Sequence, residues 1–363
     1  MPQGSARNSY RLPHVERRRL ARMSGCYRNL RKAGETVPIV RPHLKLRPIG
    51  SGLLLVTPTP RHKIPWWVVL PTARDRRKAM AMRRDLRGRV VLVTGASRGI
   101  GRRTAERLAR LGARLALSAR SQDELAKIVG ECRALGAEAE AFPADLTKPE
   151  DRARIVGDAV ARFGGLDVLV NCAGVGSFGE FSTSTPDIVR RSMEVNFFAQ
   201  AEMIRVCHPH LLKSAANWQP AVVNVASICG RWGIPSMSEH CASKHAFVGL
   251  TEALRGEFAR YDIDVLLVLP GVVRSDDLNR HMLRNDGKIY LDFDGAQPPE
   301  EVADAVVRSL LTNRTEKACG TASWWVWFGK RMFPRGVRFF MQRKVWNWHK
   351  AEGERRKADK PTA

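Results

Sequence analysis

The stretch RVVLVTGASRGIG, residues 89–101, decides the fold, because an apolar strand runs there into a glycine-rich turn. Glycines let the backbone bend tightly and approach a pyrophosphate, whose charge then lies at the N-terminus of the next helix. Residues 102–112 have a helical pattern that ends at Gly112. A strand before the glycines and a helix after them is the context that a dinucleotide-binding turn requires. An ordinary tight turn is the less specific alternative.

Four further apolar runs continue this pattern, at residues 114–118, 167–170, 221–226 and 264–269. Nearly continuous apolar runs are typical of strands in a parallel sheet that is covered on both faces. Helical stretches alternate with them, so right-handed crossovers are expected. The sequence therefore predicts an α/β fold, a Rossmann-type doubly wound parallel sheet, with a last strand over residues 318–323.

The formal net charge of +25 is concentrated at the two ends of the chain. Residues 1–86 carry 20 Lys and Arg against 4 Asp and Glu, residues 324–363 carry 11 against 3, and residues 87–323 carry 30 against 29. The neutral centre argues against nucleic-acid binding, which residues 1–86 alone would support. We expect residues 1–86 to be a basic, disordered extension, with a transit peptide or a true start at Met80 or Met82 as alternatives. Residues 87–323 would form a single folded domain of the Rossmann type.

The C-terminal region combines aromatic and basic residues. Residues 324–348 hold five Trp, four Phe and six Lys or Arg, and no acid. This composition is typical of an interfacial helix on anionic lipid. We therefore predict an amphipathic segment over residues 324–350 and peripheral contact with the cytoplasmic face of a membrane, with packing on the domain or on a partner subunit as an equal alternative. Residues 351–363 are expected to be a disordered tail.

The seven cysteines are scattered, with no spacing that suits a metal. No metal site is therefore expected. An odd cysteine count without a recognisable signal peptide is typical of a reducing cytoplasm. No run of about 20 apolar residues suggests a spanning helix.

The end of the second predicted strand indicates which dinucleotide is bound. An NAD site usually places an acid there to hold the ribose 2′-hydroxyl. This chain has Ser118, Ala119 and Arg120 instead, and Arg98 lies in the glycine turn. Guanidinium groups suit a 2′-phosphate, so NADP(H) is favoured over NAD(H). In the alternative, Arg120 is only a solvated residue at a helix start.

These features and several later motifs resemble the short-chain dehydrogenase/reductase family over about residues 87–320. NCAG (171–174) resembles the turn after the family's fourth strand, Asp145 and Leu146 resemble the pair that contacts adenine, and PGVVRS (270–275) resembles the loop beside the nicotinamide. The resemblance implies an oxidoreductase acting on an alcohol/carbonyl pair, and a homo-oligomer. The residues that the turn motif and the resemblance place at the cofactor are Gly95, Ser97, Arg98, Gly99, Ile100, Gly101, Arg120, Asp145, Leu146, Asn171, Ala173, Gly174, Lys244, Pro270, Gly271, Val273 and Ser275.

The resemblance also implies a catalytic set of Asn196, Ser227, Lys244 and a residue that departs from the pattern, His240. In the family a tyrosine at this place exchanges a proton with the substrate. The serine steadies the substrate oxygen, and the lysine holds the nicotinamide ribose and lowers the tyrosine pKa. The 13-residue interval from Ser227 to His240 matches the family pattern. Tyr290 is the alternative proton donor.

A histidine changes the expected chemistry. Imidazole titrates near pH 6.5, against about 10 for a phenol. Lys244 and an oxidised nicotinamide would both repel a proton from His240. Neutral imidazole is a usable base for alcohol oxidation but a poor acid for carbonyl reduction, and losing positioned acid–base catalysis costs about 10²–10⁴-fold in rate. We expect an NADP(H)-dependent oxidoreductase, slow or specialised, with a lipophilic substrate. The alternative is a catalytically silent NADP(H)-binding protein, a cofactor sensor or a membrane-associated scaffold.

Overall fold

The computed structural model of the chain describes the backbone of residues 45–49, 52–56 and 69–71, then residues 84–274, 282–284 and 296–320, and a few positions between 328 and 343. The chain divides into two units, Met1–Met80 and Ala81–Ala363. The first unit contains an antiparallel sheet of β1 (Lys45–Ile49), β2 (Gly52–Val56) and β3 (Val69–Pro71). These strands were not expected, because residues 1–86 were predicted to be disordered. Most other residues of that extension, and the whole predicted tail 351–363, lie outside the described residues.

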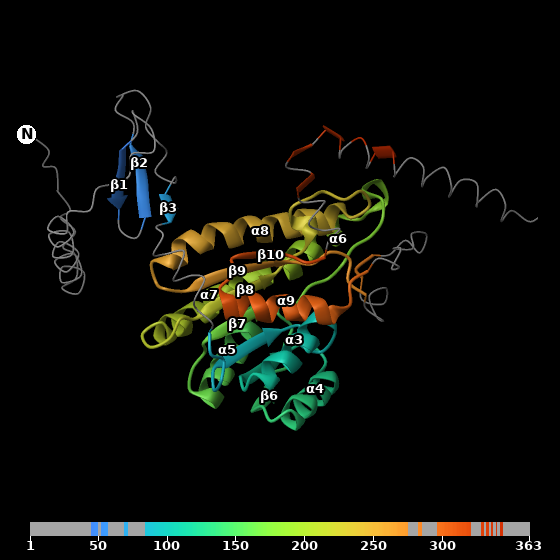
Figure 1. The fold of residues 1–363 in the computed structure, drawn as a ribbon. Coiled ribbons are helices and arrows are strands. Elements are labelled where there is room, and N and C mark those ends of the chain that lie inside the picture. Colours follow the sequence, from blue (N-terminus) through green and yellow to red (C-terminus); the bar gives the residue numbers. More distant parts are fainter. Residues whose placement is uncertain are drawn as a thin grey trace, which may run out of the picture. The chain divides into compact units, whose positions relative to one another are not determined.

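A seven-stranded sheet forms the centre of the second unit (Figure 1). Its order is β10-β9-β8-β7-β4-β5-β6, and every neighbouring pair is parallel. This arrangement confirms the predicted Rossmann-type fold. The strands are β4 (Val90–Thr94), β5 (Arg114–Ser118), β6 (Ala139–Ala141), β7 (Val168–Asn171), β8 (Ala221–Val225), β9 (Asp264–Leu269) and β10 (Glu316–Ala318).

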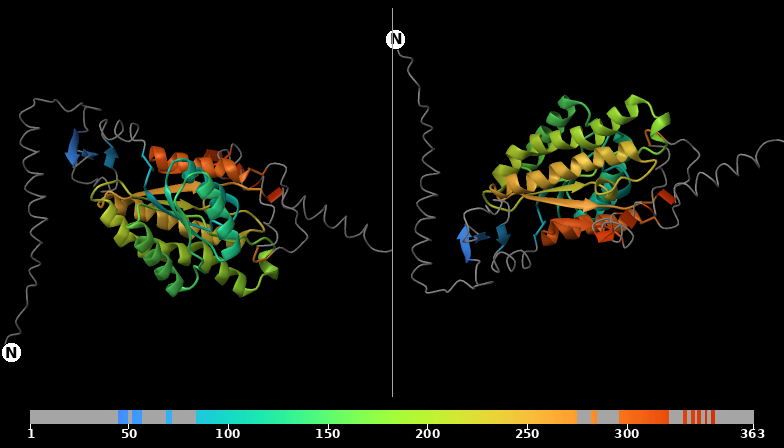
Figure 2. Two further views of the ribbon diagram at one scale, coloured as in Figure 1. Left: turned by 90° about the horizontal axis from the view of Figure 1, so that it is seen from below. Right: turned by 90° about the horizontal axis from the view of Figure 1, so that it is seen from above.

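Helices cover both faces of the sheet (Figure 2). One layer consists of α3 (Gly99–Arg110), α4 (Gln122–Ala134) and α9 (Pro299–Thr312), and the other of α5 (Pro149–Phe163), α7 (Ala199–Ser214) and α8 (Ser238–Ala259). Alternate side chains of a strand point to opposite faces, so Val91 and Val93 enter the first core while Val90 and Leu92 enter the second. The remaining elements are η1 (Phe181–Thr183), α6 (Pro186–Met193), the π-helical turn η2 (Glu194–Phe198) and the 3-10 turn η3 (Ile228–Gly230).

Two strand predictions need correction. The last strand was expected over residues 318–323, but β10 ends at Ala318. Strand β6 was not predicted, because its three residues include Glu140 and make no apolar run. Both are the outermost strands of the sheet, which pair on one side only and need less apolar surface.

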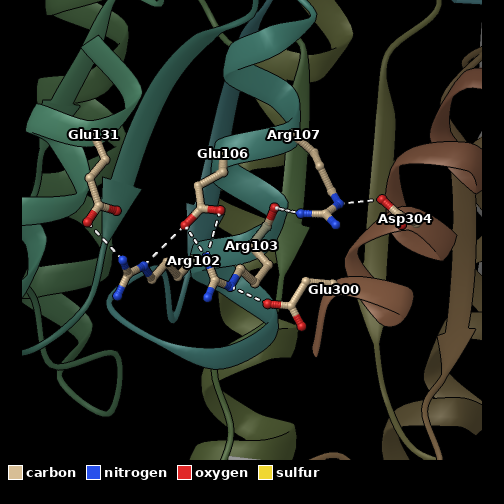
Figure 3. Close-up of polar contacts among 7 residues, drawn as sticks. All are labelled: Arg102, Arg103, Glu106, Arg107, Glu131, Glu300 and Asp304. Carbon is tan, nitrogen blue, oxygen red and sulfur yellow. Dashed lines mark hydrogen bonds and ion pairs between the residues drawn. The ribbon is translucent and has the colours of Figure 1, made fainter. Parts of the chain in front are cut away.

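Ion pairs join the helices of the first layer (Figure 3). Arg102 of α3 contacts Glu131 of α4 at 2.8 Å, and Arg103 contacts Glu300 of α9 at 2.7 Å. Arg107 of α3 pairs with Asp304 of α9. These three arginines along α3 therefore join it to α4 and α9.

Arg84, the first described residue of this unit, packs on the domain and lies three residues before the predicted boundary at residue 87. The guanidinium of Arg84 pairs with Asp264 and donates to the carbonyl oxygens of Leu310 (2.6 Å) and Gln219 (3.1 Å). Arg84 is 5% exposed and Leu86 is 1% exposed. We call this set of contacts the Arg84 clamp.

The chain order of the sheet reverses beside β4, since β5 and β6 extend one way and β7 to β10 the other. In open parallel sheets ligands bind outside the carboxyl ends of the strands at such a reversal. Most predicted site residues follow the carboxyl ends of β4 to β9, while Asn196 lies in η2 and His240 and Lys244 lie in α8. Among the helices in the described ranges, none is both long and apolar enough to cross a membrane.

Candidate active site

The glycine turn between β4 and α3 is tightly packed at two glycines and open at a third. Gly95 has a φ of +65°, and a Cβ there would lie 2.8 Å from the Cα of Ala173. A Cβ on Gly101 would lie 2.1 Å from the carbonyl oxygen of Gly95. At Gly99, with a φ of +51°, a Cβ would meet no described atom within 4 Å. The turn thus needs glycine for its own shape and presents open backbone at Gly99, as a phosphate-binding turn does.

The N-terminus of α3 has the electrostatics of an anion site. Arg98 is the N-cap residue, its side chain makes no capping hydrogen bond, and no acid lies in the first turn. The first N–H groups of a helix lack intrahelical acceptors and carry the positive end of the dipole. Ser97 is buried, and Ile100 packs against the core below the turn. These residues fit the pyrophosphate of a dinucleotide.

The end of β5 and the loop after β6 would meet the adenosine half of such a ligand. Ser118 is fully buried, and its hydroxyl has no hydrogen-bond partner among the described residues. Arg120, two residues later, is exposed. One carboxylate oxygen of Asp145 accepts from the backbone N–H (3.0 Å) and the hydroxyl (2.8 Å) of Thr147. The carboxylate is thus held in a turn beside Leu146, which is 8% exposed.

The NCAG turn after β7 is fixed from two sides. The hydroxyl oxygen of Thr94 accepts from the backbone N–H groups of Cys172 (3.0 Å) and Ala173 (3.2 Å). The side-chain amide of Asn171 donates to the side-chain oxygen of Asn224 at 3.1 Å, which joins β7 to β8. Asn171 is 1% exposed. Its predicted part in cofactor binding would therefore be to hold the turn.

Asn196 joins this turn to helix α8, which carries His240 and Lys244. Its side-chain oxygen accepts from the N–H of Val175 (2.9 Å), and its amide donates to the carbonyl oxygen of Val175 (3.0 Å) and to the hydroxyl of Ser243 (3.0 Å). A Cβ on Gly174 would lie 3.1 Å from the Asn196 oxygen and 3.5 Å from the Lys244 Nζ. Three of the predicted residues therefore meet at one place.

Lys244 and Ser227 lie beside the end of β8. The Nζ of Lys244 donates to the carbonyl oxygen of Val225 at 3.4 Å, and the side chain is buried. Burial lowers the pKa of Lys244 to about 8. The hydroxyl of Ser227 accepts from the N–H of Cys229 (3.1 Å) and donates to the carbonyl oxygen of Pro270 (3.5 Å).

His240 contacts the same peptide group as Asn196. Its Nδ1 lies 3.2 Å from the carbonyl oxygen of Val175. A carbonyl oxygen only accepts, so Nδ1 carries the proton and Nε2 keeps a lone pair in the neutral ring. Burial and the ammonium of Lys244 lower the pKa of His240 to about 4, against the smaller opposing effect of the Val175 contact. The arrangement therefore holds a neutral imidazole in one tautomer.

The predicted nicotinamide loop is described in part. Pro270 directly follows β9, and Gly271 and Val273 are partly buried. Ser275 and the alternative donor Tyr290 lie outside the described residues. No group of three or more His, Cys, Asp or Glu that could hold a metal occurs in the part of the chain that the structure describes.

Two features of the site were not predicted from the sequence. The peptide group of Val175 is a backbone element, so no residue type signals it. Glu239 precedes His240 and is 1% exposed. Its carboxylate accepts from the hydroxyl of Ser177 at 3.4 Å and lies 3.9 Å from Arg284. A carboxylate next to the unusual histidine was visible in the sequence, but its burial was not.

Comparisons with known proteins agree with this fold. A family model described as short chain dehydrogenase matches residues 89–285. Dehydrogenase/reductase SDR family member 7B of Bos taurus is 32% identical over 241 residues, which cover 64% of this chain and 73% of that protein. The 11-beta-hydroxysteroid dehydrogenase A of Arachis hypogaea is 34% identical over 252 residues, which cover 66% and 70%. A solved short chain dehydrogenase/reductase from Burkholderia phymatum in complex with NAD superposes with a TM-score of 0.58 at 26% identity, over 65% of this chain and 90% of that one.

Proposed function

The chain belongs to the short chain dehydrogenase family, and from this premise we propose that it is an NADP(H)-dependent oxidoreductase that interconverts an alcohol and a carbonyl compound, with His240 as its base. The observation that carries the proposal is the carbonyl of Val175, which both Asn196 and His240 contact beside Lys244. A half-buried imidazole held in one tautomer is what a general base needs.

Each side chain has a distinct part in alcohol oxidation. When bound, the nicotinamide supplies the acceptor for the hydride that leaves the alcohol carbon. Nε2 of His240 takes the hydroxyl proton, because it is the ring nitrogen that keeps a lone pair. Ser227 steadies the substrate oxygen, and its long hydrogen bond of 3.5 Å to Pro270 is easily exchanged for one to a substrate. Lys244 holds the ribose, while Asn196 keeps α8 and the Val175 turn in register.

The electrostatics favour oxidation over reduction. With its pKa lowered to about 4, His240 is neutral at physiological pH. With this pKa the imidazole is a weak base, but its Nε2 lone pair can still take a proton, whereas the neutral ring has no proton on Nε2 to give to a carbonyl. Lys244 repels a proton from the ring, so it supports the base form rather than the acid form.

The preference for NADP(H) rests on charge at the end of β5. No carboxylate follows Ser118, and exposed Arg120 can meet a 2′-phosphate. Arg102 and Arg103 are engaged with Glu131 and Glu300 (Figure 3), so exposed Arg120 is the guanidinium that we propose for the phosphate. The solved relative from Burkholderia phymatum holds NAD, so the preference needs its own test. We expect Arg120→Ala to weaken NADP⁺ binding about tenfold and to have little effect on NAD⁺ binding. As the control, Arg110→Ala at the far end of α3 should leave the affinity for both dinucleotides unchanged.

We propose a lipophilic substrate, and two observations support it. A relative from Arachis hypogaea is named for a hydroxysteroid. In the predicted amphipathic segment 324–350, the described residues Met332, Phe333 and Phe339 are 55%, 68% and 63% exposed. Exposed apolar and basic residues suit contact with anionic lipid. Sedimentation with phosphatidylserine vesicles tests this part: Phe333→Ser with Phe339→Ser should lose binding, and Phe181→Ser, at an exposed phenylalanine elsewhere, should keep it.

The main test is turnover. NADP⁺ reduction and NADPH oxidation are measured over a panel of lipophilic alcohols and carbonyl compounds for wild type, His240→Ala and His240→Tyr. Exposed His245 on the same helix provides the matched control, His245→Ala. Wild-type oxidation that falls about 10²-fold or more in His240→Ala supports the proposal. Turnover only in His240→Tyr would instead identify a cofactor-binding protein that no longer catalyses the reaction, such as a cofactor sensor or a scaffold.

A further inference from the structure

The residues that follow the NCAG turn, 175–180, contact two different parts of the chain in alternation. We call them the 175–180 segment. The odd-numbered residues contact α8 or the turn before it, in the pairs Val175 with His240, Ser177 with Glu239 and Gly179 with Ser236. The even-numbered residues, Gly176, Phe178 and Glu180, contact Leu283 and Arg284. One short segment therefore connects the proposed base to residues 283 and 284.

Ser236, two residues before α8, meets this segment with strained backbone. The N–H of Gly179 donates to the carbonyl oxygen of Ser236 at 2.8 Å. Ser236 has a φ of +63°, which is unfavourable for a residue with a side chain. Such backbone persists only where the surrounding contacts over-determine it, and it clusters at active sites. The hydroxyl of Ser177 adds a second contact, since it donates to the carboxylate of Glu239 at 3.4 Å. The segment and the start of α8 are therefore held together despite local strain.

The other side of the segment is held by residues 283 and 284. The N–H of Leu283 donates to the carbonyl oxygen of Gly176, and the N–H of Phe178 donates to the carbonyl oxygen of Arg284, both at 2.9 Å. The guanidinium of Arg284 donates to the carbonyl oxygen of Glu180 at 2.7 Å. Two backbone hydrogen bonds and one guanidinium thus fix this side.

A buried ion pair joins the two sides. Nη1 of Arg284 lies 3.9 Å from Oε1 of Glu239, and the two side chains are 11% and 0% exposed. Among the described residues, Oε1 of Glu239 has no hydrogen-bond partner, so Arg284 offsets its charge. A buried carboxylate depends on such a partner, because burial removes the water that would otherwise solvate it. Arg284 therefore holds Glu239 and the end of the 175–180 segment at the same time.

We propose that Arg284 and Glu239 are positioning residues for His240 and act on it through the 175–180 segment. The proposal rests on the proposed role of His240 as the base. The carbonyl of Val175 requires the proton on Nδ1 and so leaves Nε2 with its lone pair. Asn196 binds the Val175 peptide from η2, whereas the ion pair holds the residues that follow Val175.

Loss of the ion pair loosens the tautomer. Without it the residues after Val175 can shift, and the carbonyl oxygen moves away from Nδ1 of His240. The ring proton is then shared between the two nitrogens, and a ring with its proton on Nε2 cannot take a proton from an alcohol there. We expect kcat for oxidation to fall about tenfold, the net contribution of one hydrogen bond. KM for NADP⁺ should stay unchanged, because neither Arg284 nor Glu239 is among the predicted cofactor residues.

The first experiment determines the tautomer and needs no turnover. The full chain is labelled with ¹⁵N-histidine, and long-range ¹H–¹⁵N NMR spectra near neutral pH show which ring nitrogen carries the proton; the signals lost in His240→Ala belong to His240. In wild type the proton should lie on Nδ1 alone, and in Arg284→Met and Glu239→Gln both nitrogens should share it. The double variant Arg284→Met with Glu239→Gln leaves no unpaired buried charge, so it provides the same test if Arg284→Met does not fold.

Arg84→Met is the matched control. It also separates a buried arginine from its acid, at Asp264, where β9 begins, whereas the predicted site lies toward the carboxyl ends of the strands. The control should lose stability but keep the wild-type tautomer and kcat.

The outcomes separate this proposal from the proposed function. A wild-type proton on Nε2, or a tautomer that is the same in wild type and in the Arg284 and Glu239 variants, overturns the positioning role. An equal fall of kcat in Arg84→Met overturns it as well, because the loss would then follow from stability alone. If the tautomer changes as expected but even wild type oxidises no alcohol, the positioning role stands and the proposed function fails.

Discussion

The pH profile of wild type and His240→Tyr tests the role of His240 most directly. Reduction of a carbonyl needs the imidazolium form as proton donor. With a pKa lowered to about 4, only about one ring in 10³ is protonated at pH 7, which costs about 4 kcal/mol. We expect kcat/KM for reduction in wild type to rise about tenfold for each pH unit between 7.5 and 5.5, while kcat/KM for oxidation stays flat.

The tyrosine variant should show the opposite pair of profiles. A phenol with a pKa near 10 stays protonated over this range, so reduction by His240→Tyr should be flat and oxidation should rise with pH. Initial rates with NADPH and NADP⁺ are measured against one alcohol/carbonyl pair, and an enzyme-free blank corrects for acid decomposition of NADPH. A wild-type reduction rate that does not change between pH 7.5 and 5.5 would show that His240 is not the proton donor.

Three further predictions concern the fold and the cofactor site. Gly99→Ala should lower the unfolding free energy by about 1–2 kcal/mol, because of the positive φ at this position, and should strongly weaken NADPH binding. Gly101→Ala, whose Cβ would lie 2.1 Å from a carbonyl oxygen, should lower the unfolding free energy in urea by about 3 kcal/mol or more. Equal losses in the two variants would contradict the packing. Burial lowers the pKa of Lys244 from 10.5 to about 8. Between these two pH values the unfolded chain binds more protons than the folded chain, so the unfolding free energy rises with pH. Below pH 8 the charged, buried lysine lowers the unfolding free energy by up to about 3 kcal/mol. Lys244→Met should therefore raise the unfolding free energy of the cofactor-free protein at pH 7 and lose that advantage by pH 10, and a constant difference would refute the assignment. Arg84→Met should cost about 3 kcal/mol because Asp264 loses its partner, and an unchanged urea midpoint would show that the pair contributes nothing.

The sequence predicted the strands best where apolar residues run without a break. Strands β5 and β9 have the predicted bounds, since each is an uninterrupted apolar run that enters the core. β6 and β10 contain Glu140 and Glu316 and belong to the outer edges, so hydrophobic pattern alone could not place them. Their position follows from pairing with a neighbour, which is a tertiary property.

The same limit applies to the active site. Side chains with a characteristic spacing, such as Asn196 and Lys244, were predictable because a motif records them. The carbonyl of Val175, which Asn196 and His240 both contact, was not predictable. A backbone group carries no residue signature, so no motif records it.

The Arg84 clamp sets where a recombinant fragment of this protein can begin. A fragment cut at residue 87 would lack the guanidinium that pairs with Asp264 and the buried side chain of Leu86. Met80 and Met82 both precede Arg84 in the sequence. Translation from either one would therefore yield a polypeptide that keeps the clamp whole, and an expression plasmid trimmed to either codon should give a domain of undiminished stability.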